Sequence, residues 1–395
     1  MINAAARIKN CLEKVISDFT KIEKGKIVII DGTPYSGSSA HALYKFISES
    51  IKYTNIKILS ENDLRINRLK NLRLFIKNFK EVCSANVILT THIYRKYKKS
   101  QVYIQLWHGI PLKAMALMDK TENADTKKMV PKNFSQYDYI ISSSPFYNTL
   151  LNSCIGVDGS KYIVTGFPRN DMLFNADAKE KLQKIIGQDI SGDKIIFYLP
   201  TFKAGYYNDR IEGATRKTNI FGFDSFNYDQ FNDFLVKNNI IFIAKLHPFE
   251  ENIFKAELSK KCSKNFILLT SDVLKEHKVD LYEILGSANM LITDYSSVYF
   301  DFLLLDRPLL FINNDIDMYE EKRGFLLGPY DFWTPGPKVK NQNELEIGII
   351  KSIMGEDEYI EQRKSLINVF HTYRDNKSSQ RVWNIIKMSF RKDVI

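Results

Sequence analysis

Two histidines occupy places where a side chain could take part in proton transfer. His108 follows the apolar run VYIQLW and precedes a glycine, and His247 follows the apolar run NIIFIAKL and precedes a proline. An imidazole at the end of a strand can exchange a proton near neutral pH or contact a phosphate. A strand-end histidine can also be satisfied by the backbone alone. Two of only six histidines in equivalent places favour the functional interpretation.

A second group of polar residues lies in ITDYSSVYFDF (292–302). The apolar start of this segment predicts the end of a strand, and we expect Asp294 or Ser296 to cap a helix that begins near Ser297. Amides and hydroxyls at a helix N-terminus can bind phosphate. Asp301 is four residues beyond Ser297, so it lies on roughly the same face. An ordinary capped helix is the alternative.

Three further segments carry polar residues after apolar runs. GFPRND offers Arg169, whose guanidinium can hold a phosphate through two hydrogen bonds, although a surface arginine is the alternative. PTFK offers Thr201 after the run KIIFYL. The turn GTPYSGSS (32–39) resembles a phosphate-binding loop, but a glycine-rich turn is a weak signal and the P-loop pattern GxxxxGKS is absent.

Strands alternating with helices must position these residues. Short apolar runs separated by helical segments predict parallel sheets with crossover helices, and ligands gather beyond the carboxyl ends of such strands. The predicted strands lie in KIVIID, NIKILS, ANVILTT, VYIQLW, YDYIISSS and KYIVTGF, and then in KIIFYLPTF, NIIFIAKLHP, FILLTS, ANMLITDYSS and RPLLFIN.

The chain is long enough for two domains. Its 395 residues exceed the size at which one hydrophobic core usually stops growing. We predict an α/β fold of the GT-B type, in which two Rossmann-like domains face an interdomain cleft. The expected domains are 1–172 and 173–370, with a polar helical linker at 170–193. A C-terminal helix in 371–395 is expected to pack back on the first domain.

Composition excludes several classes of protein. Apolar residues make up 44% and charged residues 26%, which is typical of a globular protein. The four cysteines are scattered and no HExxH motif occurs, so we expect no metal site and a reducing, cytoplasmic location. No apolar run approaches the length of a membrane-spanning helix, and no signal peptide is recognisable. The formal charge of +10 favours an anionic partner, although no RNA-binding signature is present.

The segment 65–80 has the pattern of a basic amphipathic helix. Such a helix can lie on an anionic membrane, or it can pack its apolar face on the sheet and leave its basic face in water. The basic string YRKYKK (94–99) slightly favours the membrane. The apolar stripe comprises Ile66, Leu69, Leu72, Phe75, Ile76 and Phe79, and the basic residues are Arg65, Arg68, Lys70, Arg73, Lys77 and Lys80.

Seven strings together resemble the CDP-glycerol glycerophosphotransferase family, which builds teichoic acids and related capsule polymers. They occur in the order YSGSSAHALY, QLWHGIPLK, YIVTGFPRND, FYLPTFK, KLHPFE, TDYSSVYFDFLLLDRP and RGFLLGPYDFWTPGP. The resemblance runs from about Asp31 to the C-terminal RVWNII. It implies a GT-B fold with acceptor and membrane functions in the N-terminal domain and the CDP-activated donor in the C-terminal domain.

The resemblance also implies a reaction and roles for the candidate residues. An acceptor hydroxyl would attack the glycerol-linked phosphorus of CDP-glycerol and expel CMP, with no cofactor. His108 would be the base, and His247 with Ser296 and Ser297 would stabilise charge on the pyrophosphate. The remaining candidates would bind substrate: Arg169, Thr201, Asp294 and Asp301. In PTFK, Phe202 and Lys203 replace the family's frequent tryptophan and arginine, which affects the expected donor contacts.

The sequence is compatible with several alternatives. CDP-ribitol could replace CDP-glycerol, and the enzyme could add one unit or many to a lipid-linked or polymeric acceptor at the inner face of the cell membrane. A GT-B glycosyltransferase that uses a nucleotide sugar is a second class. A non-enzymatic basic protein on anionic lipid or nucleic acid is a third, but it leaves the two strand-end histidines unexplained. Oligomeric state is not predicted.

Overall fold

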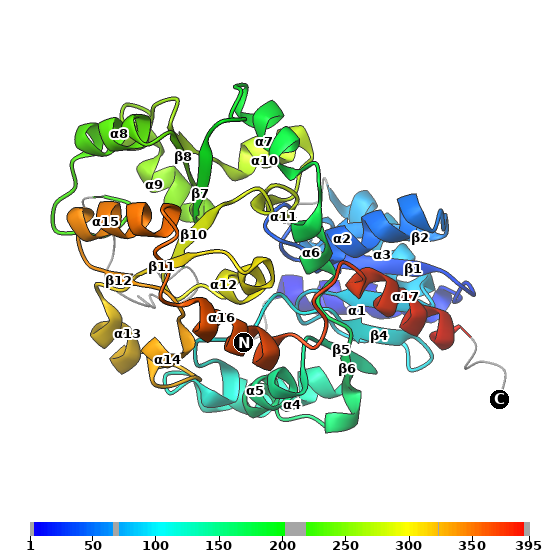
Figure 1. Ribbon diagram of the computed structural model, residues 1–395. Coiled ribbons are helices and arrows are strands. Elements are labelled where there is room, and N and C mark those ends of the chain that lie inside the picture. Colours follow the sequence, from blue (N-terminus) through cyan, green and yellow to red (C-terminus); the bar gives the residue numbers. More distant parts are fainter. Residues whose placement is uncertain (1–3, 66–70, 202–218, 323, 391–395) are drawn as a thin grey trace.

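Two parallel six-stranded sheets form the frame of the molecule (Figure 1). The computed structural model describes residues 4–65, 71–201, 219–322 and 324–390. Within these residues the first sheet has the order β2-β1-β3-β4-β5-β6 and the second the order β12-β11-β10-β7-β8-β9. Every strand pair is parallel. The strands are β1 Ile27–Asp31, β2 Ile56–Ser60, β3 Val87–Thr90, β4 Val102–Gln105, β5 Tyr139–Ser142, β6 Tyr162–Val164, β7 Lys194–Tyr198, β8 Ile240–Ala244, β9 Phe266–Leu268, β10 Met290–Thr293, β11 Leu309–Ile312 and β12 Lys338–Val339.

The predicted strands are confirmed, with one omission. Each of the eleven apolar runs contains one strand. The omitted strand, β12, has only two residues and pairs with β11 at the edge of the second sheet. So short a strand leaves no apolar run in the sequence.

Helices connect the strands and cover the sheets. The first half contains α1 Ala4–Phe19, α2 Ser39–Lys45, α3 Leu72–Ser84, α4 Ala124–Ser135, α5 Pro145–Ile155 and α6 Pro168–Asp171. The second half contains α7 Ala178–Ile186, α8 Tyr228–Lys237, α9 Pro248–Leu258, α10 Ser271–His277, α11 Leu281–Leu285, α12 Val298–Phe302, α13 Ile316–Lys322, α14 Tyr330–Trp333 and α15 Gln342–Ile353. The chain ends with α16 Ile360–Phe370 and α17 Ser378–Ser389.

The two halves share one hydrophobic core. A continuous cluster of buried apolar side chains runs from the first sheet through α11 and α12 to the inner face of the second sheet. A separate cluster fills the outer side of the second sheet, beneath α8 and α15. The shared core holds the carboxyl-end loops of both sheets in a fixed relation.

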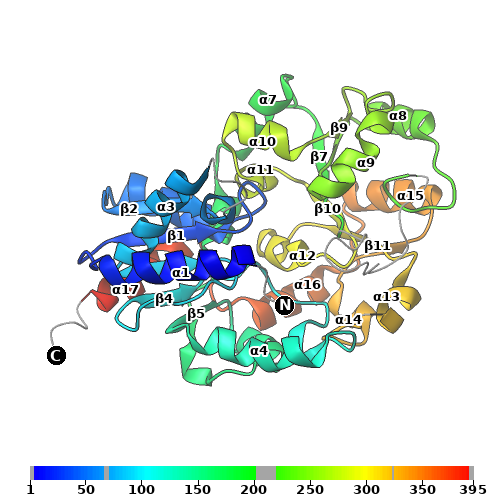
Figure 2. The ribbon, with the colours of Figure 1, turned by 180° about the vertical axis from the view of Figure 1, so that it is seen from behind.

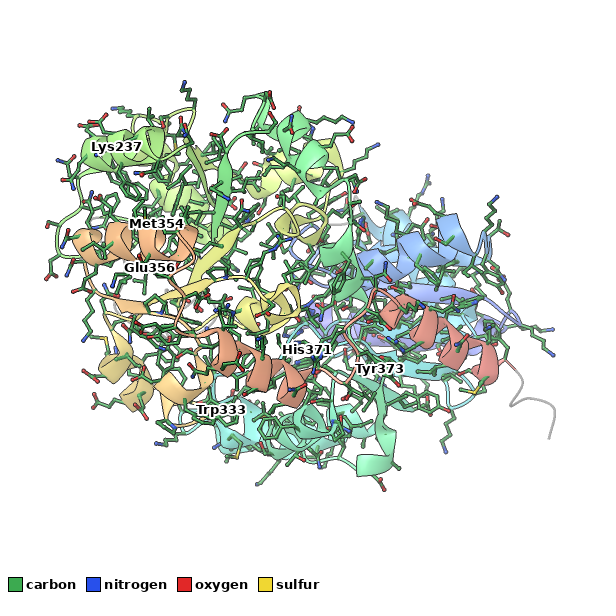
Figure 3. The ribbon with its side chains drawn as sticks, viewed as in Figure 1. Lys237, Trp333, Met354, Glu356, His371 and Tyr373 are labelled. Carbon is green, nitrogen blue, oxygen red and sulfur yellow. The ribbon has the colours of Figure 1, made fainter. Side chains whose placement is uncertain are left out.

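The C-terminal segment returns to the first half. His371, after α16, is almost fully buried, and its Nε2 lies 2.7 Å from the carbonyl oxygen of Phe300 (Figure 3). Helix α17 then lies beside α6 (Figure 1), where the Asp171 carboxylate accepts hydrogen bonds from the amides of Ser378 and Ser379 at 2.9 and 2.7 Å. The boundaries at 172 and 370 stay a prediction.

The apolar face of the basic helix is partly covered. Residues 66–70 lie outside the described residues, and α3 begins at Leu72. Phe75 and Phe79 are buried and pack in a small cluster with Ile16 of α1. Figure 2 shows α1 running across this side of the molecule near α3. In the described part of the segment, α1 therefore covers the apolar face, and the basic residues of α3 stay exposed. None of the helices in the described ranges has both the length and the apolar character needed to cross a membrane.

Candidate active site

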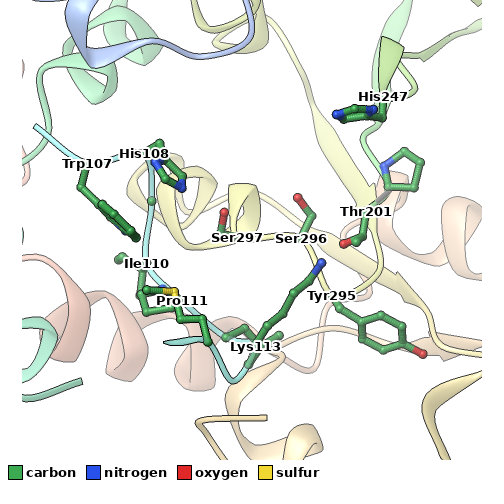
Figure 4. A pocket seen from close by; sticks show the side chains of 14 residues that line it. Trp107, His108, Ile110, Pro111, Lys113, Thr201, His247, Tyr295, Ser296 and Ser297 are labelled. Atoms are coloured by element: carbon green, nitrogen blue, oxygen red, sulfur yellow. The ribbon is translucent and has the colours of Figure 1, made fainter. Parts of the chain in front are cut away.

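Four of the eight candidate residues occupy equivalent places, one after each of four strands. Each lies three residues beyond the last residue of its strand. Strands β10, β7 and β8 are neighbours, so three of these loops lie side by side at the carboxyl edge of the second sheet. The loop after β4 reaches them from the first sheet (Figure 4). Strand β4 ends at Gln105 and is followed by His108, and β7 ends at Tyr198 and is followed by Thr201. Strand β8 ends at Ala244 and is followed by His247, and β10 ends at Thr293 and is followed by Ser296.

Two adjoining cavities in the described part of the chain meet at these loops. One has a volume of about 370 Å³ and the other of about 200 Å³. The first extends over the loop after β4 and toward Tyr295, and the second extends toward Lys245 and Tyr282. Both halves of the molecule therefore line one cleft. The residues common to the two cavities are His108, Pro200, His247, Ser296 and Ser297.

The surroundings of His108 fix its tautomer. Its Nδ1 lies 3.0 Å from the carbonyl oxygen of Thr91. Because a carbonyl can only accept a hydrogen bond, Nδ1 carries the proton and Nε2 keeps a lone pair. The ring stacks on His92 and Trp107 at centroid distances of 4.6 and 4.3 Å. Burial, with repulsion from His92 and Arg169, lowers the pKa of His108 to about 3. At neutral pH the imidazole is uncharged and can accept a proton.

The backbone around His108 is constrained on both sides. Trp107 has a φ of 53°, in the left-handed region that only a few per cent of non-glycine residues adopt. Gly109 has a φ of 142°, and a Cβ there would lie 2.9 Å from both Arg169 Nη2 and Ser297 Oγ. The glycine allows the loop to approach both groups closely.

Arg169 supports the His108 loop from behind. Its Nη1 donates to the carbonyl oxygen of His108 at 2.6 Å, and its Nη2 pairs with the Asp301 carboxylate. Tyr282 donates to the same carboxylate at 2.7 Å. Asp301 is fully buried and does not line either cavity. Asp301 holds Arg169, which does border the second cavity, and the substrate contact predicted for Asp301 stays a prediction.

His247 faces the same cleft from the second sheet. It immediately precedes Pro248, the first residue of α9, and it is half-buried. Burial and the charge of Lys245 lower its pKa to about 4, against the opposite effect of Glu251. His247 is thus uncharged at neutral pH, and it can stabilise an anion by donating a hydrogen bond from a neutral imidazole.

The expected cap of α12 is wrong. Ser297 precedes the helix in a helical conformation and makes no capping hydrogen bond. Asp294 instead accepts hydrogen bonds from the amides of Thr201 and Tyr295 at 2.7 and 2.6 Å. Asp294 is buried and braces the neighbouring loop, whereas Thr201, Ser296 and Ser297 line the first cavity.

The turn that resembles a phosphate-binding loop holds a carboxylate. The amides of Gly37 and Ser38 donate to Asp280 of the second half, with nitrogen–oxygen distances of 3.1–3.2 Å. A side chain thus fills the place expected for a phosphate. Asp280 directly precedes α11, and the amide of Leu281 in that helix donates to the carbonyl oxygen of Tyr35 in the turn at 3.3 Å. Only Ser36 of this turn lines the second cavity.

The comparison with protein families decides the assignment. The family described as CDP-Glycerol:Poly(glycerophosphate) glycerophosphotransferase matches residues 21–388. The chain belongs to this family.

Individual relatives agree with the assignment. The chain is 29% identical over 350 residues to the teichoic acid glycerol-phosphate primase of Bacillus subtilis, covering 86% of this chain and 81% of that protein. It is 29% identical to the teichoic acid glycerol-phosphate transferase of Staphylococcus aureus, covering 72% and 70%. It is 30% identical to the teichoic acid poly(ribitol-phosphate) polymerase of Bacillus spizizenii, covering 73% of this chain but only 43% of that protein.

Solved structures confirm the fold. A structure of the wall teichoic acid polymerase TagF matches with a TM-score of 0.77 and 22% identity, covering 100% of this chain and 97% of that chain. The family, the GT-B fold and the enzyme class predicted from the sequence are confirmed.

Two lysines of the glycerophosphotransferase site were missed as candidates. Lys113 lines the first cavity, and Figure 4 shows its amine directed toward the loop of Tyr295 and Ser296. Lys245 lines the second cavity, two residues before His247. Both belong to the quoted strings QLWHGIPLK and KLHPFE, so an inspection of every polar residue in the strand-end loops would have found them.

No cluster of metal ligands stands out in the site. Among the described residues, no group of three or more histidine, cysteine, aspartate or glutamate side chains is arranged to hold a metal ion. The prediction that the enzyme needs no metal or cofactor stays a prediction. Phe202 and Lys203, which follow Thr201, lie outside the described residues.

Proposed function

We propose that this enzyme transfers glycerol phosphate from CDP-glycerol to a hydroxyl of a lipid-linked or polymeric acceptor, releasing CMP, in the synthesis of a teichoic-acid-like polymer. The main observation is the placement of two histidines, one from the loops of each sheet, at a single cleft. Family membership supports the choice of donor. Ribitol phosphate from CDP-ribitol is the second candidate, because three relatives carry the name of a ribitol-phosphate polymerase.

The geometry supports a direct displacement at phosphorus. Nε2 of His108 takes the proton of the acceptor hydroxyl, and the oxygen attacks the phosphorus that carries glycerol. The bond from that phosphorus to the bridging oxygen breaks, and CMP leaves with the electron pair. His247 and the hydroxyls of Ser296 and Ser297 stabilise the negative charge that develops on the leaving phosphate.

A panel of donors tests the proposal. With purified enzyme and a membrane fraction as acceptor, CDP-glycerol should release CMP at least about tenfold faster than CDP-ribitol, which corresponds to a difference of about 1.4 kcal/mol in transition-state binding. UDP-sugars should release no UDP. Faster release from CDP-ribitol would reassign the donor, and release of UDP alone would replace the proposal by a nucleotide-sugar glycosyltransferase.

The rate should depend little on pH in the acidic range. The pKa values of His108 and His247, about 3 and about 4, are both lowered. Lowering the pH from about 8 to about 5.5 therefore leaves both imidazoles uncharged, and kcat/KM for CDP-glycerol should change less than about threefold. With an ordinary histidine pKa near 6.5, the neutral fraction would fall about tenfold over the same range. A tenfold fall in kcat/KM would contradict the described surroundings of the two rings.

We further propose that the enzyme lies on the cytoplasmic, anionic surface of the cell membrane. The formal charge of +10 supports this, as do the exposed basic residues of α3: Arg73, Lys77 and Lys80. Leu74 on α3 and Phe19 at the end of α1 are 51% and 86% exposed. The protein should co-sediment with vesicles that contain phosphatidylglycerol, and about 0.5 M salt should weaken the binding.

Charge reversal on α3 tests whether vesicle binding depends on the basic residues of this helix or on the overall charge of the protein. Exchanging the three basic residues of α3 for glutamate should lower vesicle binding by at least about tenfold, since each is worth about 1 kcal/mol near an anionic surface. The matched control exchanges three exposed lysines of the second half: Lys237, Lys260 and Lys275. Equal losses in the two triple variants would refute the patch on α3.

A further inference from the structure

Lys245 lies beside the site but has no hydrogen bond left for a substrate. Its side chain borders the second cavity and is only 6% exposed. Its Nζ donates to Glu251 Oε1 at 2.6 Å, to the carbonyl oxygen of Leu246 at 2.8 Å and to Ser271 Oγ at 3.0 Å. An ammonium has three N–H donors. Since all three are engaged within the protein, a direct bond to a donor phosphate would require the loss of one of them.

The partners of Lys245 connect three loops around His247. Glu251, in the first turn of α9, is as deeply buried as Lys245. Its carboxylate also accepts from the amide of Ser271 at 3.1–3.2 Å, at the start of α10. The amide of Glu251 donates to the carbonyl oxygen of His247 at 2.9 Å. The end of β8, the first turn of α9 and the start of α10 are therefore tied together, with His247 between them.

The same arrangement sets the charge near the imidazole. The Lys245 ammonium disfavours a second positive charge on His247, and the Glu251 carboxylate favours it. Burial disfavours the charged imidazole most, and of the two side chains Lys245 has the larger effect. The other titratable or charged side chains that border the two cavities containing His247 are His108, Lys113, Arg169, Tyr282 and Tyr295.

We propose that Lys245 is a positioning residue, which holds the His247 turn through Glu251 and Ser271 and places a positive charge beside the His247 imidazole. The catalytic consequence rests on the proposed function, since it assumes that His247 contacts the donor. The structural part does not, because it concerns only contacts within the protein. Lys245 thus acts through His247 and not on the substrate itself.

Titration of His247 by NMR tests the inference without any substrate. The protein is labelled with ¹³C-histidine, and the His247 signal is assigned by its loss in His247→Gln. In Lys245→Met the pKa of His247 should rise by at least about one unit, a tenfold change in proton affinity. In Lys245→Arg, which keeps the charge, it should stay near the wild-type value of about 4. An unchanged titration in Lys245→Met, or equal shifts in both variants, would overturn the inference.

A second variant tests the inference if Lys245→Met fails to fold. Lys245→Met leaves the Glu251 carboxylate buried without its partner, which destabilises a protein. The double variant Lys245→Gln/Glu251→Gln removes both charges and allows the two amides to hydrogen-bond. Its His247 pKa should lie between those of the wild type and Lys245→Met, because the loss of Glu251 opposes the loss of Lys245. A pKa at or above that of Lys245→Met would count against the inference.

Activity measurements then separate the two proposals. The ratio of kcat at pH about 8 to kcat at pH about 5 should be about twofold larger in Lys245→Met than in the wild type, because a rise of one unit in the His247 pKa leaves about half of the imidazole protonated at pH 5. In the double variant the ratio should lie between these two values. A merely structural role for Lys245 would lower kcat equally at both values. A wild-type enzyme that releases no CMP but shows the expected NMR shifts would refute the proposed function alone.

Discussion

His108→Ala should lower kcat for CMP release from CDP-glycerol by about 10²–10⁴-fold, the usual contribution of a general base. The described geometry gives His108 this role, since Nδ1 is committed to the Thr91 carbonyl and Nε2 is left to accept the hydroxyl proton. Arg169 fixes the backbone of the same residue through its carbonyl oxygen. The rate should be measured at saturating donor, with circular dichroism as the check of folding.

Two further variants test whether the loss of activity is specific to the imidazole of His108. His108→Gln keeps a donor for the Thr91 carbonyl but supplies no base of suitable strength, so it should be about as inactive as His108→Ala. His277→Ala changes an exposed histidine on α10 and should keep the wild-type rate. If His108→Gln retained more than about one third of the wild-type rate, another group would have to take the proton.

Asp301→Ala should lower the free energy of unfolding by about 3–5 kcal/mol, because it leaves the Arg169 guanidinium buried without its counter-charge. Arg169 is 4% exposed and Asp301 is fully buried. The Tyr282 hydroxyl loses its acceptor as well. Urea unfolding followed by circular dichroism measures the change. The matched control is Glu180→Ala, which breaks the exposed pair of Glu180 and Lys184 and should cost less than about 1 kcal/mol.

A double substitution distinguishes stability from positioning. Arg169→Met/Asp301→Leu removes both charges and fills a similar volume, so it should recover most of the lost stability. It should not recover activity, since the carbonyl oxygen of His108 still lacks its donor. A fully active double variant would show that the ion pair serves stability alone, and a fall below about 1 kcal/mol in Asp301→Ala would refute the buried pair.

The sequence could predict the strands and the loops that carry the site. Each predicted strand was a short apolar run, and such runs form strands because a parallel sheet is buried on both faces. Polar residues directly after these runs had to lie at the carboxyl edge of a sheet. For this reason His108, Thr201, His247 and Ser296 could be selected before their positions were known, and the structure brings them to one cleft.

Contacts between distant parts of the chain could not be predicted in the same way. Asp294 was expected to cap its own helix but braces Thr201 of the neighbouring loop, a contact that the local pattern does not contain. Asp301 meets Arg169 across 132 residues of sequence, and Asp280 meets Gly37 across 243. Which polar groups face the cleft and which support it from behind depends on this packing.

The most direct test of the account is the stoichiometry of transfer. Wild-type enzyme is incubated with CDP-glycerol and a purified lipid-linked acceptor, and CMP and the mass of the acceptor are measured in the same samples. The acceptor should gain one glycerol phosphate for each CMP released, and His108→Gln should abolish both. Release of CMP without any gain in acceptor mass, or a gain of mass without CMP, would contradict it.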